Sequence, residues 1–165
     1  MELSYMREAL QEAKKALDNG DFPVGCVIAG KNGILARGRR VNSKVRNELD
    51  HAEIQALRSL NTDYPELTEE KLVAYSTMEP CLMCFSALIL SNVHTIVYGY
   101  EDVMGGGTSL EVERLKPLYA EMKLNIIPGV LRAESLQLFQ KFFSEESSGY
   151  WRDSLLANYT LEQNA

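Results

Sequence analysis

The chain has 165 residues, 45% of them hydrophobic and 24% charged, which is the composition of one globular domain. No apolar run approaches the roughly 20 residues that span a bilayer, and the N-terminal segment lacks a signal-peptide core, so we expect no membrane partner. A net charge of −6 argues against a general nucleic-acid binder, and three cysteines argue against a disulfide framework, so we expect a cytoplasmic protein.

Hydrophobic periodicity and turn residues predict alternating helices and strands along the whole chain. In the first half we predict a helix over 2–17, strands over 24–29 and 34–38 around an Asn-Gly turn, a loop over 39–50 and a helix over 51–60. In the second half we predict strands over 72–77, 95–100 and 124–128, and helices over 81–90, 110–122 (with Pro117 inside it) and 132–143.

This order of elements predicts an α/β fold, a three-layer sandwich in which helices flank a five-stranded mixed sheet. A helix between the last two strands would let them run parallel by a crossover. We assign residues 1–146 to one domain and residues 147–165 to a C-terminal tail.

Two short motifs carry the chemistry of the chain. The first is His51-Ala52-Glu53, and the second is Pro80-Cys81-Leu82-Met83-Cys84. Together they offer one imidazole, two thiolates and one free carboxylate. Three protein ligands with an open fourth position are typical of catalytic zinc, whereas structural zinc has four protein ligands. The pattern H-x-E followed by P-C-x-x-C is the one described for zinc deaminases.

The spacing suits each residue to its predicted part. Cys81 and Cys84 are three positions apart, so they share one face of a helix, and its N-terminal dipole favours their thiolate forms. His51 supplies the third ligand, so we predict one Zn²⁺ per chain. Glu53 is two residues from His51, where its carboxylate can move protons between water and a leaving nitrogen.

Two other interpretations of these residues are weaker. A redox pair at Cys81 and Cys84 would leave His51 and Glu53 without a part. A closed structural zinc site would need Cys26 or His94 as its fourth ligand. The run of three glycines at 105–107 lacks the Lys-Ser/Thr of a phosphate loop, and we interpret it as a turn near the site.

Residues 3–143 resemble the cytidine-deaminase-like superfamily, in the branch of tRNA adenosine deaminases, guanine deaminases and fungal-type cytosine deaminases. The segments that carry the resemblance are Phe22-Pro23-Val24-Gly25, Val41-Asn42 and residues 77–84. The resemblance implies zinc on His51, Cys81 and Cys84, with Glu53 as proton shuttle. It also implies that Asn42 hydrogen-bonds the base, that backbone groups of Ala52 and Glu79 hold the amidine, and that the protein is a homodimer.

The chain departs from tRNA-acting relatives in ways that bear on the substrate. Asp50 replaces a small residue, the loop over 101–109 is short, and the segment over 142–146 turns acidic, which would repel RNA. Residues 150–153 resemble the aromatic-acidic tail that closes over a small base in cytosine deaminases, which implies substrate contacts from Trp151 and Asp153. Alternatively, the tail packs on the core or on a second copy.

We therefore predict a zinc-dependent hydrolytic deaminase that releases ammonia from a nucleobase or nucleoside of the cytosine or guanine type. The first alternative is a tRNA-specific adenosine deaminase, which the acidic charge disfavours. The second is a non-catalytic zinc-binding partner subunit of a deaminase, and the presence of Glu53 argues against it.

Overall fold

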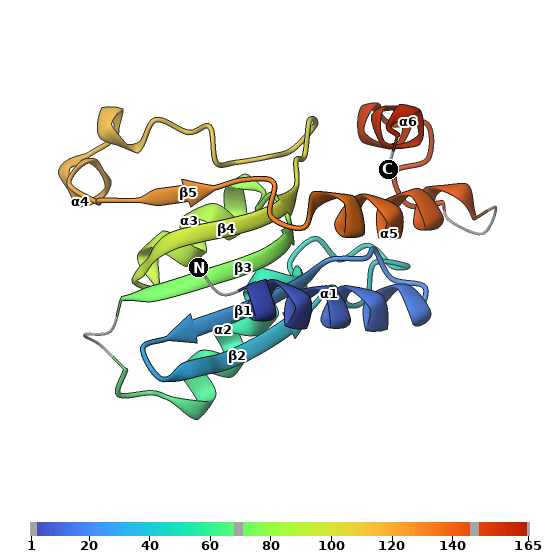
Figure 1. Cartoon of the computed structure of the whole chain (residues 1–165). Helices are drawn as coiled ribbons and strands as arrows, with labels where there is room; N and C mark the ends of the chain where they lie inside the picture. Colours follow the sequence, from blue (N-terminus) through green and yellow to red (C-terminus); the bar gives the residue numbers. More distant parts are fainter. Residues whose placement is uncertain (1–2, 68–70, 146–148, 165) are drawn as a thin grey trace.

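Helices cover both faces of a five-stranded sheet in the computed structural model, which describes residues 3–67, 71–145 and 149–164 (Figure 1). The strands are β1 (Gly25–Gly30), β2 (Gly33–Arg39), β3 (Leu72–Met78), β4 (Val93–Tyr100) and β5 (Asn125–Ile127). The helices are α1 (Leu3–Asp18), α2 (Ala52–Asp63), α3 (Leu82–Leu90), α4 (Pro117–Ala120), α5 (Arg132–Ser144) and α6 (Leu155–Glu162), with a 3₁₀ turn η1 (Val112–Arg114).

The sheet is mixed, with the strand order β2-β1-β3-β4-β5. Strand β1 runs antiparallel to both β2 and β3, while β3, β4 and β5 are parallel to one another. The predicted three-layer α/β sandwich is confirmed, including the parallel last two strands. Because β2, β3 and β4 all point the same way, their carboxyl ends lie at one edge of the sheet. The loops that follow these three strands therefore all start at that edge.

The two faces of the sheet carry separate apolar layers. Helices α1 and α5 lie on one face, and α2 and α3 lie on the other (Figure 1). Alternation along β1 divides its side chains, so that Val27 packs with Met6 of α1 and Ile28 belongs to the larger cluster that includes Ala56 of α2.

Helix α2 lies unusually close to β2, and a glycine makes this possible. A Cβ atom on Gly38 would lie 2.2 Å from the backbone oxygen of Ala52 and 2.4 Å from the backbone nitrogen of Ala56. Such distances are far below van der Waals contact, so only glycine fits between strand and helix. This contact brings the first turn of α2, which carries Glu53, against the sheet edge.

The predicted helix over 110–122 is wrong. The structure has η1 and the short α4 there, separated by Leu115 and Lys116, which both have extended ψ angles. Proline disfavours helical backbone at the residue before it and has no N–H to donate, so Pro117 starts a new helix instead of continuing one. Helices α2 and α3 also begin one residue later than predicted, because His51 and Cys81 are their extended N-cap residues.

The C-terminal tail is packed into the domain. Leu156, Ala157 and Thr160 of α6 are buried, and the Thr160 hydroxyl lies 3.1 Å from the Tyr100 hydroxyl at the end of β4. The predicted boundary between residues 146 and 147, like the predicted helix start at residue 2, lies outside the described residues. Within the described ranges, every helix is too short or too polar to cross a membrane.

Candidate metal centre and active site

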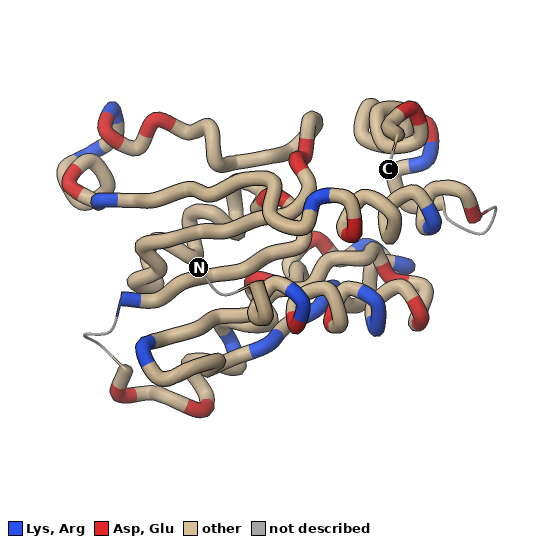
Figure 2. The backbone as a smooth tube through the Cα atoms, viewed as in Figure 1, with Lys and Arg blue, Asp and Glu red and all other residues tan. Residues whose placement is uncertain are grey.

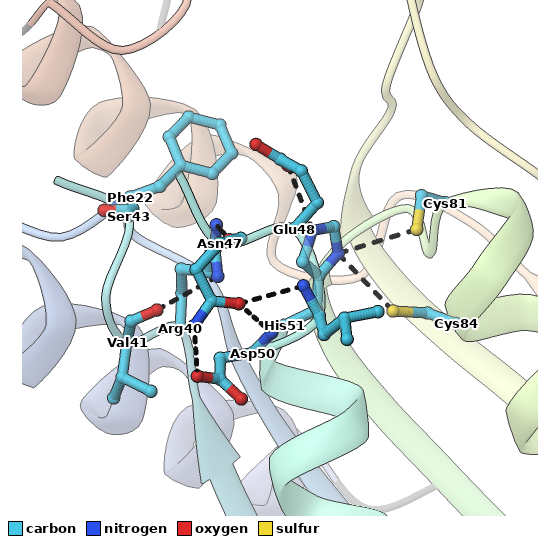
Figure 3. A network of polar contacts seen from close by, with 11 residues as sticks. Phe22, Arg40, Val41, Ser43, Asn47, Glu48, Asp50, His51, Cys81 and Cys84 are labelled. Atoms are coloured by element: carbon cyan, nitrogen blue, oxygen red, sulfur yellow. Dashed lines mark hydrogen bonds and ion pairs between the residues drawn. The ribbon is translucent and has the colours of Figure 1, made fainter. Parts of the chain in front are cut away.

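The three predicted metal ligands meet at the sheet edge formed by the carboxyl ends of β2, β3 and β4. His51 stands at the start of α2, Cys81 is the N-cap of α3, and Cys84 lies in the first turn of α3. The Nδ1 atom of His51 is 3.5 Å from the Sγ atom of each cysteine, and the three ligand atoms lie within 4.8 Å of one another (Figure 3).

This geometry fits a tetrahedral zinc ion. Zn–N bonds of about 2.0–2.1 Å and Zn–S bonds of about 2.3 Å, at a tetrahedral angle, put nitrogen and sulfur about 3.6 Å apart. The two observed separations of 3.5 Å match that value without any side-chain movement. One imidazole and two thiolates are also a donor set that zinc prefers, and they leave the fourth position for a reactant.

The ligands influence one another's protonation. Hydrogen bonding from Cys84 and, to a smaller extent, from His51 lowers the pKa of Cys81 to about 4. The same shared proton raises the pKa of Cys84. Hydrogen bonding to Cys81 raises the pKa of His51. At neutral pH at least one sulfur is therefore a thiolate, which is the form that binds metal.

Glu53 is buried beside this cluster, with 3% of its surface exposed. The hydroxyl of Ser76, on β3, donates a 2.8 Å hydrogen bond to its Oε1 atom and fixes the carboxylate. Burial raises the pKa of Glu53 above its ordinary value. A carboxyl group whose pKa moves toward neutrality can both accept and return a proton, as a proton shuttle must.

A cavity of about 300 Å³ opens in front of the cluster and is largely apolar. Among the predicted site residues, His51, Ala52, Glu53, Glu79, Cys81 and Trp151 line it. Cys84 is buried behind this wall. Other residues that line the cavity come from the strand ends and the tail: Phe22, Val24, Arg40, Glu48, Met78, Asp102, Met104, Gly105, Tyr150 and Leu156.

The side chain of Glu79 supports the loop after β4. Its Oε2 atom accepts a hydrogen bond from the backbone N–H of Asp102, and its Oε1 atom accepts a 2.5 Å hydrogen bond from the Thr108 hydroxyl. The run of glycines lies close against it, because a Cβ atom on Gly106 would be only 2.4 Å from the Glu79 carboxylate. This loop thereby forms part of the cavity wall.

The structure does not bring Asn42 or Asp153 into the cavity. Asn42 has a left-handed backbone (φ 58°), and its side-chain amide donates a 3.0 Å hydrogen bond to Oδ2 of Asp50. The same Asp50 carboxylate accepts hydrogen bonds from Asn47 and Gln55, so it organises the loop before His51. Asp153 is exposed, also with a positive φ. Neither residue lines the cavity, and the base contacts that the resemblance implies for them stay predictions.

Arg40 is one of the cavity residues that were not predicted from the sequence, and it is 2% exposed. It belongs to the short basic run Arg37-Gly38-Arg39-Arg40, whose composition is typical of a solvated strand end. A signal was nonetheless present, because alternate residues of a strand share one face and Ala36, Gly38 and Arg40 are all buried. Figure 3 shows Arg40 and the two cysteines on opposite sides of His51.

Comparison with known proteins agrees with this site. Residues 1–100 match the cytidine and deoxycytidylate deaminase zinc-binding region. A tRNA-specific adenosine deaminase of Bacillus subtilis is 32% identical over 145 residues, a match that covers 86% of this chain and 88% of the relative.

Solved structures share the fold. A structure from a study of A-to-I editing by tRNA:A34 deaminases has a TM-score of 0.70 and 25% identity, over 83% of this chain and 99% of that one. Guanine deaminase from Nitrosomonas europaea has a TM-score of 0.71 over 86% of this chain and 84% of that one. Its identity of 18% makes this second likeness one of fold alone.

Proposed function

The chain belongs to the cytidine and deoxycytidylate deaminase family, and from that premise we propose that it removes the exocyclic amine of a free nucleobase or nucleoside of the guanine or cytosine type. Membership makes it a zinc-dependent hydrolytic deaminase. The choice of substrate within that class is the proposal.

The observation that carries the proposal is the cavity itself. Its volume of about 300 Å³ is at the lower end of the range of roughly 300–1,000 Å³ for small-molecule sites. Three residues from beyond α5, namely Tyr150, Trp151 and Leu156, form part of its wall. Trp151 is 45% exposed, so its ring stands at the mouth, where it can cover a planar base. A small, aromatic-walled cavity suits a single base.

Each residue of the site has a separate role in the proposed reaction. His51, Cys81 and Cys84 hold zinc, which when bound supplies a Lewis acid that lowers the pKa of water to about 7. Glu53 accepts one proton of the attacking water, whose oxygen bonds to the carbon bearing the amine, and delivers it to the adjacent ring nitrogen, which takes up the electron pair of the C=N bond. Glu53 then carries the remaining hydroxyl proton to the amine nitrogen, the C–N bond breaks, and ammonia leaves a carbonyl behind. Ser76 keeps the carboxylate oriented throughout.

A second candidate is deamination of adenosine in tRNA, and the sequence comparison favours it, because the Bacillus subtilis relative is a tRNA-specific enzyme. The charges of the described surface argue for the smaller substrate. Figure 2 shows basic residues of α1 and β2 interspersed with acidic ones. Arg37 pairs with Glu8, and Arg39 and Lys15 both pair with Glu12, so acidic partners offset much of the positive charge of these three side chains. Phosphate binding depends on unneutralised cations.

An ammonia-release panel tests the proposal. We expect the zinc-loaded enzyme to release ammonia from guanine, cytosine or one of their nucleosides, and to leave adenine and an anticodon stem-loop unchanged. Release confined to the stem-loop would establish the second candidate instead. Release from none of these substrates would contradict both.

We also propose a cytoplasmic homodimer. All three cysteines lie outside disulfides, as is usual in a reducing compartment. Beside the metal-binding helix, Leu82, Leu110 and Leu115 are each more than one-third exposed and line one groove with the glycine loop. Burial of this groove against a second copy would remove its apolar surface from water. Sedimentation velocity should give a dimer, and Leu82→Glu should shift it toward monomer; a wild-type monomer at micromolar concentration would refute the proposal.

A further inference from the structure

Arg40 is a buried cation at the end of β2, in the wall of the catalytic cavity. It ranks first by size among the described side chains that are almost completely buried. Its Nη1 atom donates to the backbone oxygen of Val41 and its Nη2 atom to that of Asn47, at 3.0 and 2.5 Å. The guanidinium also lies 5.9 Å from the centre of the Tyr150 ring. It is therefore held firmly in one orientation.

This cation lacks a counter-ion in the described part of the chain. None of the arginine ion pairs found there involves Arg40, and its Nε atom is buried without a hydrogen-bond partner. Glu48 lines the same cavity, but its carboxylate is directed to His51, 4.0 Å from Nε2. The guanidinium therefore has donor capacity that the described side chains do not use. A buried donor without an acceptor is costly unless a bound group supplies one.

The chemistry of the guanidinium limits which groups can bind to it. Arginine has five N–H donors in a planar fork and no acceptor, so its partner must present acceptors only. A carbonyl oxygen beside a bare ring nitrogen is such a partner, as O6 and N7 of guanine are for arginine. Cytosine also has a carbonyl oxygen. Adenine has no carbonyl oxygen, because its single exocyclic group is the amine that must face the zinc ligands, so it offers Arg40 no such acceptor.

We propose that Arg40 determines specificity by binding a carbonyl oxygen of the substrate base, so that the enzyme selects oxo-bases such as guanine and cytosine over adenine. This inference rests on the proposed function of the same cavity. The amine faces the zinc ligands and Glu53, and the oxygen faces Arg40 on the other side of His51. The enzyme should therefore have a higher kcat/KM for a base that carries this oxygen than for the same base without it.

Two pairs of substrates isolate that oxygen: guanine against 2-aminopurine, and cytosine against 4-aminopyrimidine. A hydrogen bond to a charged donor corresponds to a difference of about 10- to 100-fold in kcat/KM, and we expect at least one pair to show it in favour of the oxo-base. Arg40→Met keeps the length of the side chain but removes every donor, and should bring the ratio close to one. Arg40→Lys, which keeps the charge without the fork, should retain part of the preference.

Arg37→Met is the matched control, because Arg37 lies three residues before Arg40, on β2, with its side chain exposed and paired to Glu8. It should keep the wild-type ratio. The wild-type ratio needs no variant, so the test survives even if Arg40→Met fails to fold. Equal turnover within both pairs by the wild type would overturn the role of Arg40, as would an unchanged ratio in folded Arg40→Met.

Failure of this inference and failure of the proposed function give different results. Deamination confined to adenosine in the stem-loop overturns the role of Arg40 and leaves deamination intact. If no substrate releases ammonia, the proposed function fails, and calorimetric binding of guanine and 2-aminopurine then tests Arg40 separately. Tighter binding of guanine that is lost in Arg40→Met would support the role, and equal binding of the two bases would overturn it.

Discussion

Replacement of Glu53 by glutamine should lower kcat by at least about 10²–10⁴-fold, the range typical of general acid–base catalysis. Glutamine has nearly the same shape, and its amide oxygen can still accept the hydrogen bond from Ser76. It cannot carry a proton between water and the leaving amine at neutral pH. Because the substitution also removes a buried charge, we expect no loss of thermal stability. Steady-state ammonia release with the best substrate of the panel measures the effect.

Zinc content distinguishes loss of a proton carrier from damage to the metal centre. Glu53 is not among the three residues whose ligand atoms converge, so Glu53→Gln should retain about one zinc per chain. The conservative exchange Glu53→Asp keeps a carboxylate but shortens its reach, and it should fall between the wild type and glutamine. Near-normal turnover by a zinc-loaded Glu53→Gln protein would remove Glu53 from its part in the reaction.

The metal centre and the sheet could be predicted from the sequence because each depends on local patterns. Alternation and helical period identify strands and helices within a few residues, and His51, Cys81 and Cys84 have chemistry that few other combinations share. The wrong prediction of one helix over 110–122 also has a local cause. Pro117, which lies inside the predicted helix, instead begins α4 after η1 has ended.

The walls of the cavity could not be predicted in the same way, because they depend on how distant segments meet. Asn42 and Arg40 are two positions apart, yet only Arg40 faces the cavity, since the chain turns into a left-handed conformation at Asn42. The contact of Tyr150 with Arg40 joins the loop after β2 to the tail. Such contacts arise from packing rather than from any repeating pattern, and they decide the substrate.

Substitution of Cys84 by serine should abolish zinc binding and, with it, all deamination. Cys84 is buried and its Sγ atom lies 3.5 Å from Nδ1 of His51, so no other described cysteine or histidine can replace it without rebuilding the helix. A serine hydroxyl is a poor ligand because it stays protonated where a thiol ionises. Elemental analysis should find about one zinc per wild-type chain and almost none in Cys84→Ser.

Chelation gives an independent measure of the same centre. Zinc that binds only the folded chain stabilises it, so a strong chelator should lower the thermal midpoint of the wild type toward that of Cys84→Ser and leave the variant unchanged. Cys26→Ala is the control, because Cys26 is buried in the apolar cluster between β1 and α2 and lies outside the ligand set. It should keep its zinc and its response to the chelator, since a cavity in the core weakens the fold without touching the metal. A full zinc complement in Cys84→Ser would mean that the thiolates at the start of α3 are not what holds the ion.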